Sequence, residues 1–129
     1  MVLIDTSAWV EYINDGEPSI CRKVDAALSN DIVVMGDLIY CEVLQGLYNA
    51  RRRGEVRDLF LSLPQFEMVG FENAERASAN YRQLRELGVT IRKTIDVLIG
   101  TFCAENDIEL IHHDRDFENM KAVVKLKTR

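Results

Sequence analysis

The sequence predicts a single α/β domain: a mostly parallel central sheet flanked by helices on both faces. Two observations predict this class. Short apolar runs alternate along the chain with longer segments of helical periodicity, an alternation typical of parallel sheets covered on both sides. No repeat, low-complexity stretch or linker divides the 129 residues, a length that suits one hydrophobic core. We therefore expect one domain spanning residues 1–129.

Five apolar runs are expected to form the strands. Each is short and bounded by polar or turn-forming residues, which favours a strand over a helix. The runs are Val2–Asp5, Ile32–Met35, Phe66–Phe71, Ile108–His112 and Val123–Leu126. The order of the strands in the sheet does not follow from these patterns.

Six helices are expected between these runs, where apolar residues recur at helical spacing. Thr6 or Ser7 is expected to cap the first, which runs through Ile13. Pro18 suits the first position of the second. The others are expected from Asp37 to about Tyr48, over Arg51–Leu63, over Asn73–Leu87 and over Thr94–Glu105, with Pro64 and Gly88 as breakers.

Composition narrows the class of protein. A net charge of −5 and a pI near 5.0 speak against binding nucleic acid by overall charge, although a bound metal can supply positive charge locally. No apolar run approaches the roughly 18–20 residues that span a bilayer, and the N-terminus has no signal-peptide pattern, so a cytoplasmic location is expected. Cys21, Cys41 and Cys103 show no metal-ligand spacing and are expected to be reduced and buried.

Five acidic residues stand inside or shortly after apolar runs that contain no lysine or arginine. They are Asp5, Glu42, Asp96, Asp114 and Asp116. A buried ionised carboxylate is costly unless it is paired or coordinates a metal. Three of these residues follow predicted strands, and the carboxyl ends of parallel strands meet at one edge of the sheet. We therefore expect a site for a hard divalent cation at this edge.

The two remaining acids, Glu42 and Asp96, lie near the starts of predicted helices. Gly46 and Gly100 follow them by one helical turn and share their faces. The glycines are expected to leave room for a ligand or for backbone to approach.

Each acid also has a purely structural explanation. Asp5 suits a helix cap, Asp96 a first-turn acid favoured by the helix dipole, and Glu42 a residue at the rim of the core. Asp114 and Asp116 suit a turn. The coincidence of all five favours a shared site.

Four motifs in order carry a resemblance to a known family. They are Val2-Leu3-Ile4-Asp5-Thr6-Ser7, Glu42 followed by Gly46, Ile95-Asp96 through Gly100, and Leu110-Ile111 through Asp114-Arg115-Asp116-Phe117. Their order and spacing resemble PIN-domain ribonucleases, in particular the VapC-type toxins of VapBC toxin–antitoxin pairs. The resemblance covers nearly the whole chain. The chain departs from the family at His112, where Thr or Ser often stands.

The resemblance implies a metal-dependent endoribonuclease that hydrolyses RNA phosphodiester bonds as the toxin of a type II toxin–antitoxin system. Mg²⁺ or Mn²⁺ would be held by Asp5, Glu42, Asp96 and Asp114, with Asp116 as a neighbouring or alternative ligand, and all five acids would be catalytic. Thr6, Ser7 and His112 would orient water or a carboxylate, although a strand-end histidine with no catalytic task is an alternative for His112 and His113.

The resemblance also implies partners. RNA would be the substrate, and Arg51, Arg52, Arg53, Arg92 and Lys93 are the candidate contacts to it. A VapB-type antitoxin would bind a groove formed by apolar residues around Leu38–Tyr48 and Val56–Leu61, and a homodimer and a toxin–antitoxin hetero-oligomer are expected. The RNA target, the number of metal ions and the antitoxin do not follow from the sequence.

Other classes of protein fit less well. A phosphoacceptor signalling domain would need an acidic pair near the end of the first strand and a lysine after a late strand. A haloacid-dehalogenase phosphatase would need an aspartate at residue 7, where this chain has Ser7. A non-catalytic module that binds a basic partner and a PIN nuclease that is not a toxin both stay open.

Overall fold

A parallel sheet of four strands forms the centre of the domain in the computed structural model, which describes residues 1–129. The strands are β1 (Val2–Ile4), β2 (Val33–Gly36), β3 (Gln65–Phe66) and β4 (Glu109–Ile111). Their order is β3-β2-β1-β4, and each pairs with its neighbours in parallel. The predicted fold class is confirmed, and β1 and β4 prove to be neighbours.

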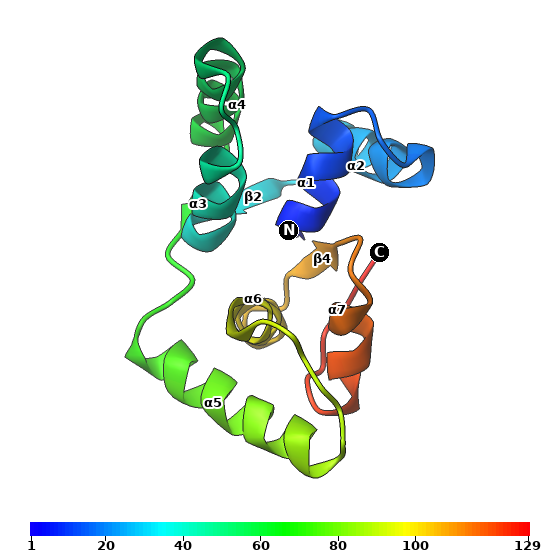
Figure 1. Ribbon diagram of the computed structural model, residues 1–129, viewed down its shortest axis with the longest axis vertical. Coiled ribbons are helices and arrows are strands. Elements are labelled where there is room, and N and C mark those ends of the chain that lie inside the picture. Colours follow the sequence, from blue (N-terminus) through cyan, green and yellow to red (C-terminus); the bar gives the residue numbers. More distant parts are fainter.

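Helices cover the sheet on both sides. They are α1 (Thr6–Ile13), α2 (Pro18–Asn30), α3 (Asp37–Gln45), α4 (Ala50–Ser62), α5 (Phe71–Glu86), α6 (Thr94–Glu105) and α7 (Arg115–Asn119). Figure 1 shows α5, α6 and α7 together on one side and α1 and α2 on the other, with α3 and α4 projecting beside β2. None of these helices combines the length and apolarity needed to cross a membrane.

Polar caps begin the first two helices. The Asp5 side chain accepts a hydrogen bond of 2.9 Å from the Ser7 backbone N–H and so caps α1. The prediction that Thr6 or Ser7 is the cap was therefore wrong by one or two residues. Pro18 occupies the first turn of α2, as predicted, with Glu17 as its cap.

Two predicted strands were wrong. The segment Phe66–Phe71 contributes only its first residue to β3, because the Met68 N–H donates to Asp37 Oδ1 at 2.9 Å instead of to a strand. The segment Val123–Leu126 forms no strand. Val124 and Leu126 are buried by side-chain packing, and the chain pairs with β4 only further on, through Leu110 and Thr128.

Several smaller expectations also changed. Helix α3 ends at Gln45 and not near Tyr48, and the short helix α7 was not predicted. Cys41 is exposed, so the expectation of buried thiols was wrong for that residue. At Gly100 an added Cβ would lie 2.3 Å from Met120 Sδ, so this glycine makes room for a methionine and not for a ligand.

The core consists of 28 buried apolar residues gathered around β1 and β2. Trp9 is fully buried against Phe60, with ring centroids 4.9 Å apart, and joins α1 to α4. Leu84 contributes from α5. This packing fixes the elements that surround the carboxyl ends of β1 and β4.

Two leucines three residues apart on the α5 segment test the extent of this core. Leu84 is fully buried and Leu87 is 63% exposed. We expect Leu84→Ala to lower the free energy of unfolding by about 2–5 kcal/mol, because it removes buried methyl groups and leaves a cavity. The matched change Leu87→Ala should cost less than about 0.5 kcal/mol in the same urea unfolding experiment. Equal losses in the two variants would contradict the placement of α5.

Candidate metal-binding site

Asp5 lies at the carboxyl end of β1, beside the end of β4. The register pairs Ile4 with Ile111, and the Asp5 backbone N–H donates to the Ile111 carbonyl at 2.8 Å. The carboxylate is 4% exposed, and its Oδ2 accepts hydrogen bonds from the Ser7 N–H at 2.9 Å and the Ser7 hydroxyl at 2.5 Å. The Ser7 hydroxyl oxygen also accepts the His113 N–H at 2.9 Å, so Ser7 ties Asp5 to the loop after β4.

Glu42 approaches from α3, the helix that begins directly after β2. Its Oε1 accepts a hydrogen bond of 2.9 Å from the Thr6 hydroxyl, and the side chain is half-buried. Thr6 and Ser7, consecutive at the start of α1, therefore each hold one carboxylate. In this structure the Thr6 hydroxyl orients the carboxylate of Glu42, and the Ser7 hydroxyl orients that of Asp5.

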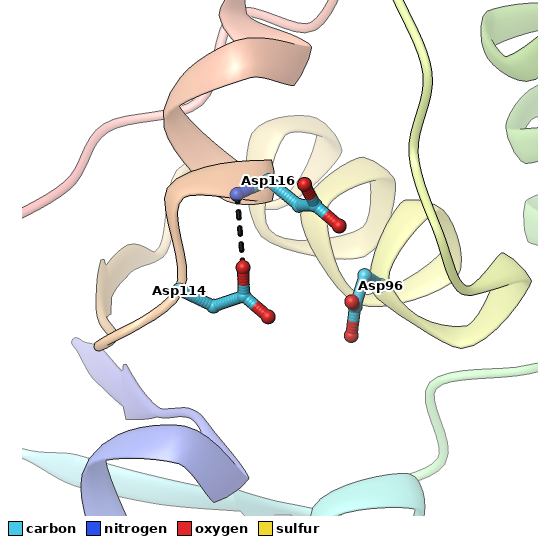
Figure 2. A group of neighbouring side chains, drawn as sticks. All are labelled: Asp96, Asp114 and Asp116. Atoms are coloured by element: carbon cyan, nitrogen blue, oxygen red, sulfur yellow. Dashed lines mark hydrogen bonds between the residues drawn. The ribbon is translucent and has the colours of Figure 1, made fainter.

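Asp96, Asp114 and Asp116 form the tightest group of acids, which we call the aspartate triplet. One carboxylate oxygen from each residue lies within 4.8 Å of the others. Figure 2 shows Asp114 and Asp116, at the start of α7, projecting toward Asp96 in the first turn of α6. Asp114 and Asp116 are further joined because the Asp116 N–H donates to Asp114 Oδ1 at 3.0 Å.

Arg92 is the cation nearest the triplet. Its Nη2 lies 2.9 Å from Asp114 Oδ1, and its Nε lies 2.9 Å from Asp116 Oδ2. The Arg92 backbone N–H donates to the same Asp116 oxygen at 3.2 Å. The segment before α6 is thus bound to the loop after β4 through the two aspartates, a role of Arg92 that the sequence did not indicate.

His112 holds the backbone of Asp114 through a hydrogen bond. The Asp114 backbone N–H donates to His112 Nδ1 at 3.1 Å, so in the neutral ring the proton is on Nε2, which donates to Glu118 Oε1 at 2.9 Å. Glu118 also accepts from the Lys121 ammonium group and from the Thr128 hydroxyl. The hydrogen bond from Lys121, followed by those from Thr128 and His112 and by the Lys121 charge, lowers the pKa of Glu118 to about 2.

Burial disfavours ionisation of Asp5, Glu42 and Asp96, and repulsion by Asp5 adds to the effect at Glu42 and Asp96. Burial raises the pKa of Asp5 and the pKa of Glu42, and the negative charge of Asp5 raises that of Glu42 further. Burial, followed by the charge of Asp5, raises the pKa of Asp96 to about 7. Asp5, Glu42 and Asp96 therefore act on one another as a single group of like charges.

The donor atoms of the site fit a hard divalent cation. Asp5 Oδ1 and Asp96 Oδ2 are buried and have no hydrogen-bond partner in the protein. Buried carboxylate oxygens without partners are rare and costly. All the converging side chains offer oxygen, the ligand that Mg²⁺ and Mn²⁺ prefer, and no thiol or free imidazole nitrogen joins them. A cation here would satisfy the orphan oxygens and relieve the repulsion.

The basic residues predicted to contact RNA lie in different places. Arg51 pairs with Glu55 on α4, while the Arg52 and Arg53 guanidinium groups donate to the backbone carbonyls of Ile13 and Leu47. Arg52 also lines a groove of about 270 Å³ together with Glu42. Lys93 caps the start of α6, close enough for its charge to oppose the rise in the pKa of Asp96.

Three polar residues near the acids were missed. Glu118 holds His112, and Lys23 and Arg115 line a groove that also contains Asp114. The only signal for Glu118 was Lys121 three residues later. Lys23 offered none, since it is distant from every motif in the sequence.

A parallel sheet whose strand ends gather buried carboxylates defines the chain as an α/β protein with an acidic cluster at one edge of the sheet. The family model for the PIN domain matches residues 2–123. The chain therefore belongs to the PIN domain family.

Known proteins similar to this chain agree with that assignment. The VapC ribonuclease Mb1587 of Mycobacterium bovis and ribonuclease VapC11 of Mycobacterium tuberculosis are each 29% identical over 129 residues, covering 98% of this chain and 96% of the relative. The VapBC2 structure from Rickettsia felis, bound to a promoter DNA fragment, has a chain that superposes with a TM-score of 0.77. The alignment covers 100% of this chain and 98% of that one at 17% identity, which shows a common fold.

The raised pKa of Asp96 predicts how stability changes with pH in the absence of metal. Because the folded pKa of about 7 exceeds the ordinary value of 3.8, the stability present below about pH 4 is lost as the pH rises through 7. Asp96→Asn removes this loss. We expect it to raise the free energy of unfolding by on the order of 1–3 kcal/mol near pH 8 and by much less near pH 4.

Urea unfolding in excess chelator at the two pH values measures this difference. Asp58→Asn, a change at an exposed residue of α4, is the matched control and should alter stability little at either pH. If Asp96→Asn is no more stable than the wild type near pH 8, ionisation of Asp96 does not lower the free energy of unfolding, and the prediction is wrong.

Proposed function

We propose that this protein is a metal-dependent endoribonuclease and the toxin of a type II toxin–antitoxin pair. The observation that carries the proposal is the pair of orphan oxygens, Asp5 Oδ1 and Asp96 Oδ2, buried at the strand ends of a PIN domain. Two proteins 29% identical over almost the whole length carry the name ribonuclease, which supports the same reaction for this chain. Its proposed place of action is the cytoplasm, where RNA is available.

The proposed ion is Mg²⁺ or Mn²⁺. Asp5, Glu42, Asp96 and Asp114 would hold it, and Asp116 belongs to the same triplet of oxygen donors as Asp96 and Asp114. When bound, such an ion activates water and neutralises charge that develops on the phosphate. RNA hydrolysis then consists of attack by water on phosphorus, cleavage of the phosphorus–oxygen bond to the leaving nucleoside, and proton transfer to that oxygen.

The contribution of the protein is to hold the carboxylates in place before the reaction. Ser7 fixes one oxygen of Asp5 with two hydrogen bonds and leaves the other free. Thr6 fixes Glu42, and His112 fixes the backbone of Asp114. Groups that need no reorganisation when charge develops are effective in catalysis. We propose these three residues as positioning residues for the site.

An apolar groove beside the site is the proposed binding surface for the antitoxin. It lies between β2, α3, α4 and β3, has a volume of about 490 Å³, and is lined by Met35, Tyr40, Leu61 and Phe66. Tyr48, 92% exposed between α3 and α4, lies outside this groove and lines the smaller one that contains Glu42. The VapBC2 complex from Rickettsia felis contains both toxin and antitoxin, which supports an antitoxin partner for this chain. A homodimer is proposed on the same family grounds.

Single substitutions at the orphaned acids test the nuclease. We expect Asp5→Asn and Asp96→Asn to lower kcat/KM for RNA cleavage by more than the roughly 10–100-fold typical of residues that only support a metal ligand. Excess chelator should abolish cleavage by the wild type, and Mn²⁺ should restore it. Asp58→Asn is the control for loss of one exposed acid. Full activity in either site variant, or in chelator, would refute the mechanism.

Expression of the chain alone in a bacterial host tests the toxin assignment. We expect growth arrest with the wild type and normal growth with Asp96→Asn, because arrest requires RNA cleavage. Co-expression of the reading frame adjacent to this gene should relieve the arrest if that frame encodes the antitoxin. If the protein cleaves RNA in vitro but its expression does not affect growth, the toxin assignment is wrong and the protein is a PIN nuclease of another kind.

A further inference from the structure

A second groove, which does not include Glu42, borders the aspartate triplet at Asp114. It lies between α2, the segment before α6 and the loop after β4, and its volume is about 580 Å³. Lys23, Arg92, His113 and Arg115 line it together with Asp114. We call it the cationic groove. A concentration of basic side chains is unusual on a protein of net charge −5 and needs an explanation.

Two of the cations in this groove have no partner within the protein. Arg92 is neutralised by Asp114 and Asp116. Lys23 and Arg115, by contrast, are exposed and take part in none of the ion pairs or side-chain hydrogen bonds of the structure, whereas Arg51, Arg76, Lys127 and Arg129 are all paired. The imidazole of His113 is also exposed, while its backbone N–H is held by Ser7.

The groove on the other side of the acids has a different chemistry. Apart from Glu42 and Arg52, it is lined largely by apolar residues, including Val10, Ile13 and Leu47. Its only cation is Arg52, whose guanidinium donates to the Ile13 carbonyl. A polyanionic strand leaving the acidic site toward α2 would therefore meet two unpaired cations, Lys23 and Arg115, in addition to Lys93 at the start of α6.

We propose that the cationic groove binds the backbone phosphates next to the scissile one, with Lys23 and Arg115 as the contacts and His113 within reach of a sugar or base. The inference rests on the proposed ribonuclease function and assigns RNA contacts that differ from Arg51, Arg52 and Arg53. Arg115 and Lys23 come from separate elements, α7 and α2, so the strand lies across the loop after β4. Asp114 belongs both to the triplet and to the groove wall, which makes the two continuous.

Binding of a fluorescein-labelled single-stranded RNA tests the proposal. The full-length protein carries Asp96→Asn to prevent cleavage, and Mg²⁺ is present. Adding Lys23→Ala and Arg115→Ala should weaken binding at least about tenfold at low salt. It should also reduce the slope of log Kobs against log salt by about 1.4, since each phosphate contact contributes about 0.7 on a single strand.

The matched control is Arg22→Ala with Lys125→Ala on the same background. It also removes one arginine and one lysine that are exposed and unpaired, but neither residue lines the groove. We expect less than a twofold change in affinity and an unchanged slope. Equal weakening in the two double variants would show a general charge effect and overturn the proposal. Unchanged affinity in the Lys23 and Arg115 variant, or no binding by the parent, would also overturn it.

Cleavage assays separate this inference from the proposed function. In the wild-type background, Lys23→Ala with Arg115→Ala should raise KM and leave kcat within about threefold, because the removed contacts act on binding. Restoring charge with Lys23→Arg and Arg115→Lys should recover most of the affinity. If the wild type does not cleave RNA, the proposed nuclease fails, and the binding experiment still decides whether the groove holds RNA.

Discussion

Repulsion among carboxylates buried at one edge of the sheet is the constraint on which the site depends. The parallel pairing of β1 with β4 brings Asp5 next to the loop that holds Asp114 and Asp116, and α6 adds Asp96. No protein cation reaches the buried oxygens of Asp5 and Asp96. Packing of the core therefore holds charges together that would separate if they were free, and this arrangement lowers folding stability until the charges are neutralised.

The neighbouring hydrogen bonds hold these acids in place. Thr6 and Ser7 hold the carboxylates of Glu42 and Asp5, and His112 accepts the backbone N–H of Asp114. Arg92 compensates two aspartates from the solvent side. The purely structural explanations of the acids were also partly correct. Asp5 does cap α1 with one oxygen, while its other oxygen stays free for a ligand.

The sequence predicted the fold class and the convergence of strand-end acids because both follow from local patterns. Apolar runs mark strands; Asp5 follows such a run directly, and Asp114 follows another after two histidines. It could not predict that β1 and β4 are neighbours, since strand order depends on how helices pack over the sheet. Val124 and Leu126 were misread as a strand because burial by packing and burial in a sheet leave the same apolar pattern. Lys23 and Glu118 were missed because their partners are distant in sequence.

The C-terminal residues are connected to the site by a short chain of contacts. Thr128 donates to Glu118, Glu118 holds the ring of His112, and His112 accepts the N–H of Asp114. Arg129 meanwhile pairs with Asp31 and Glu109. The end of the chain is therefore a poor attachment point for an affinity tag or a fluorescent fusion. Strain introduced there would reach Asp114, a member of the aspartate triplet, through three side chains, whereas Met1 has no side-chain contact of this kind to the acids.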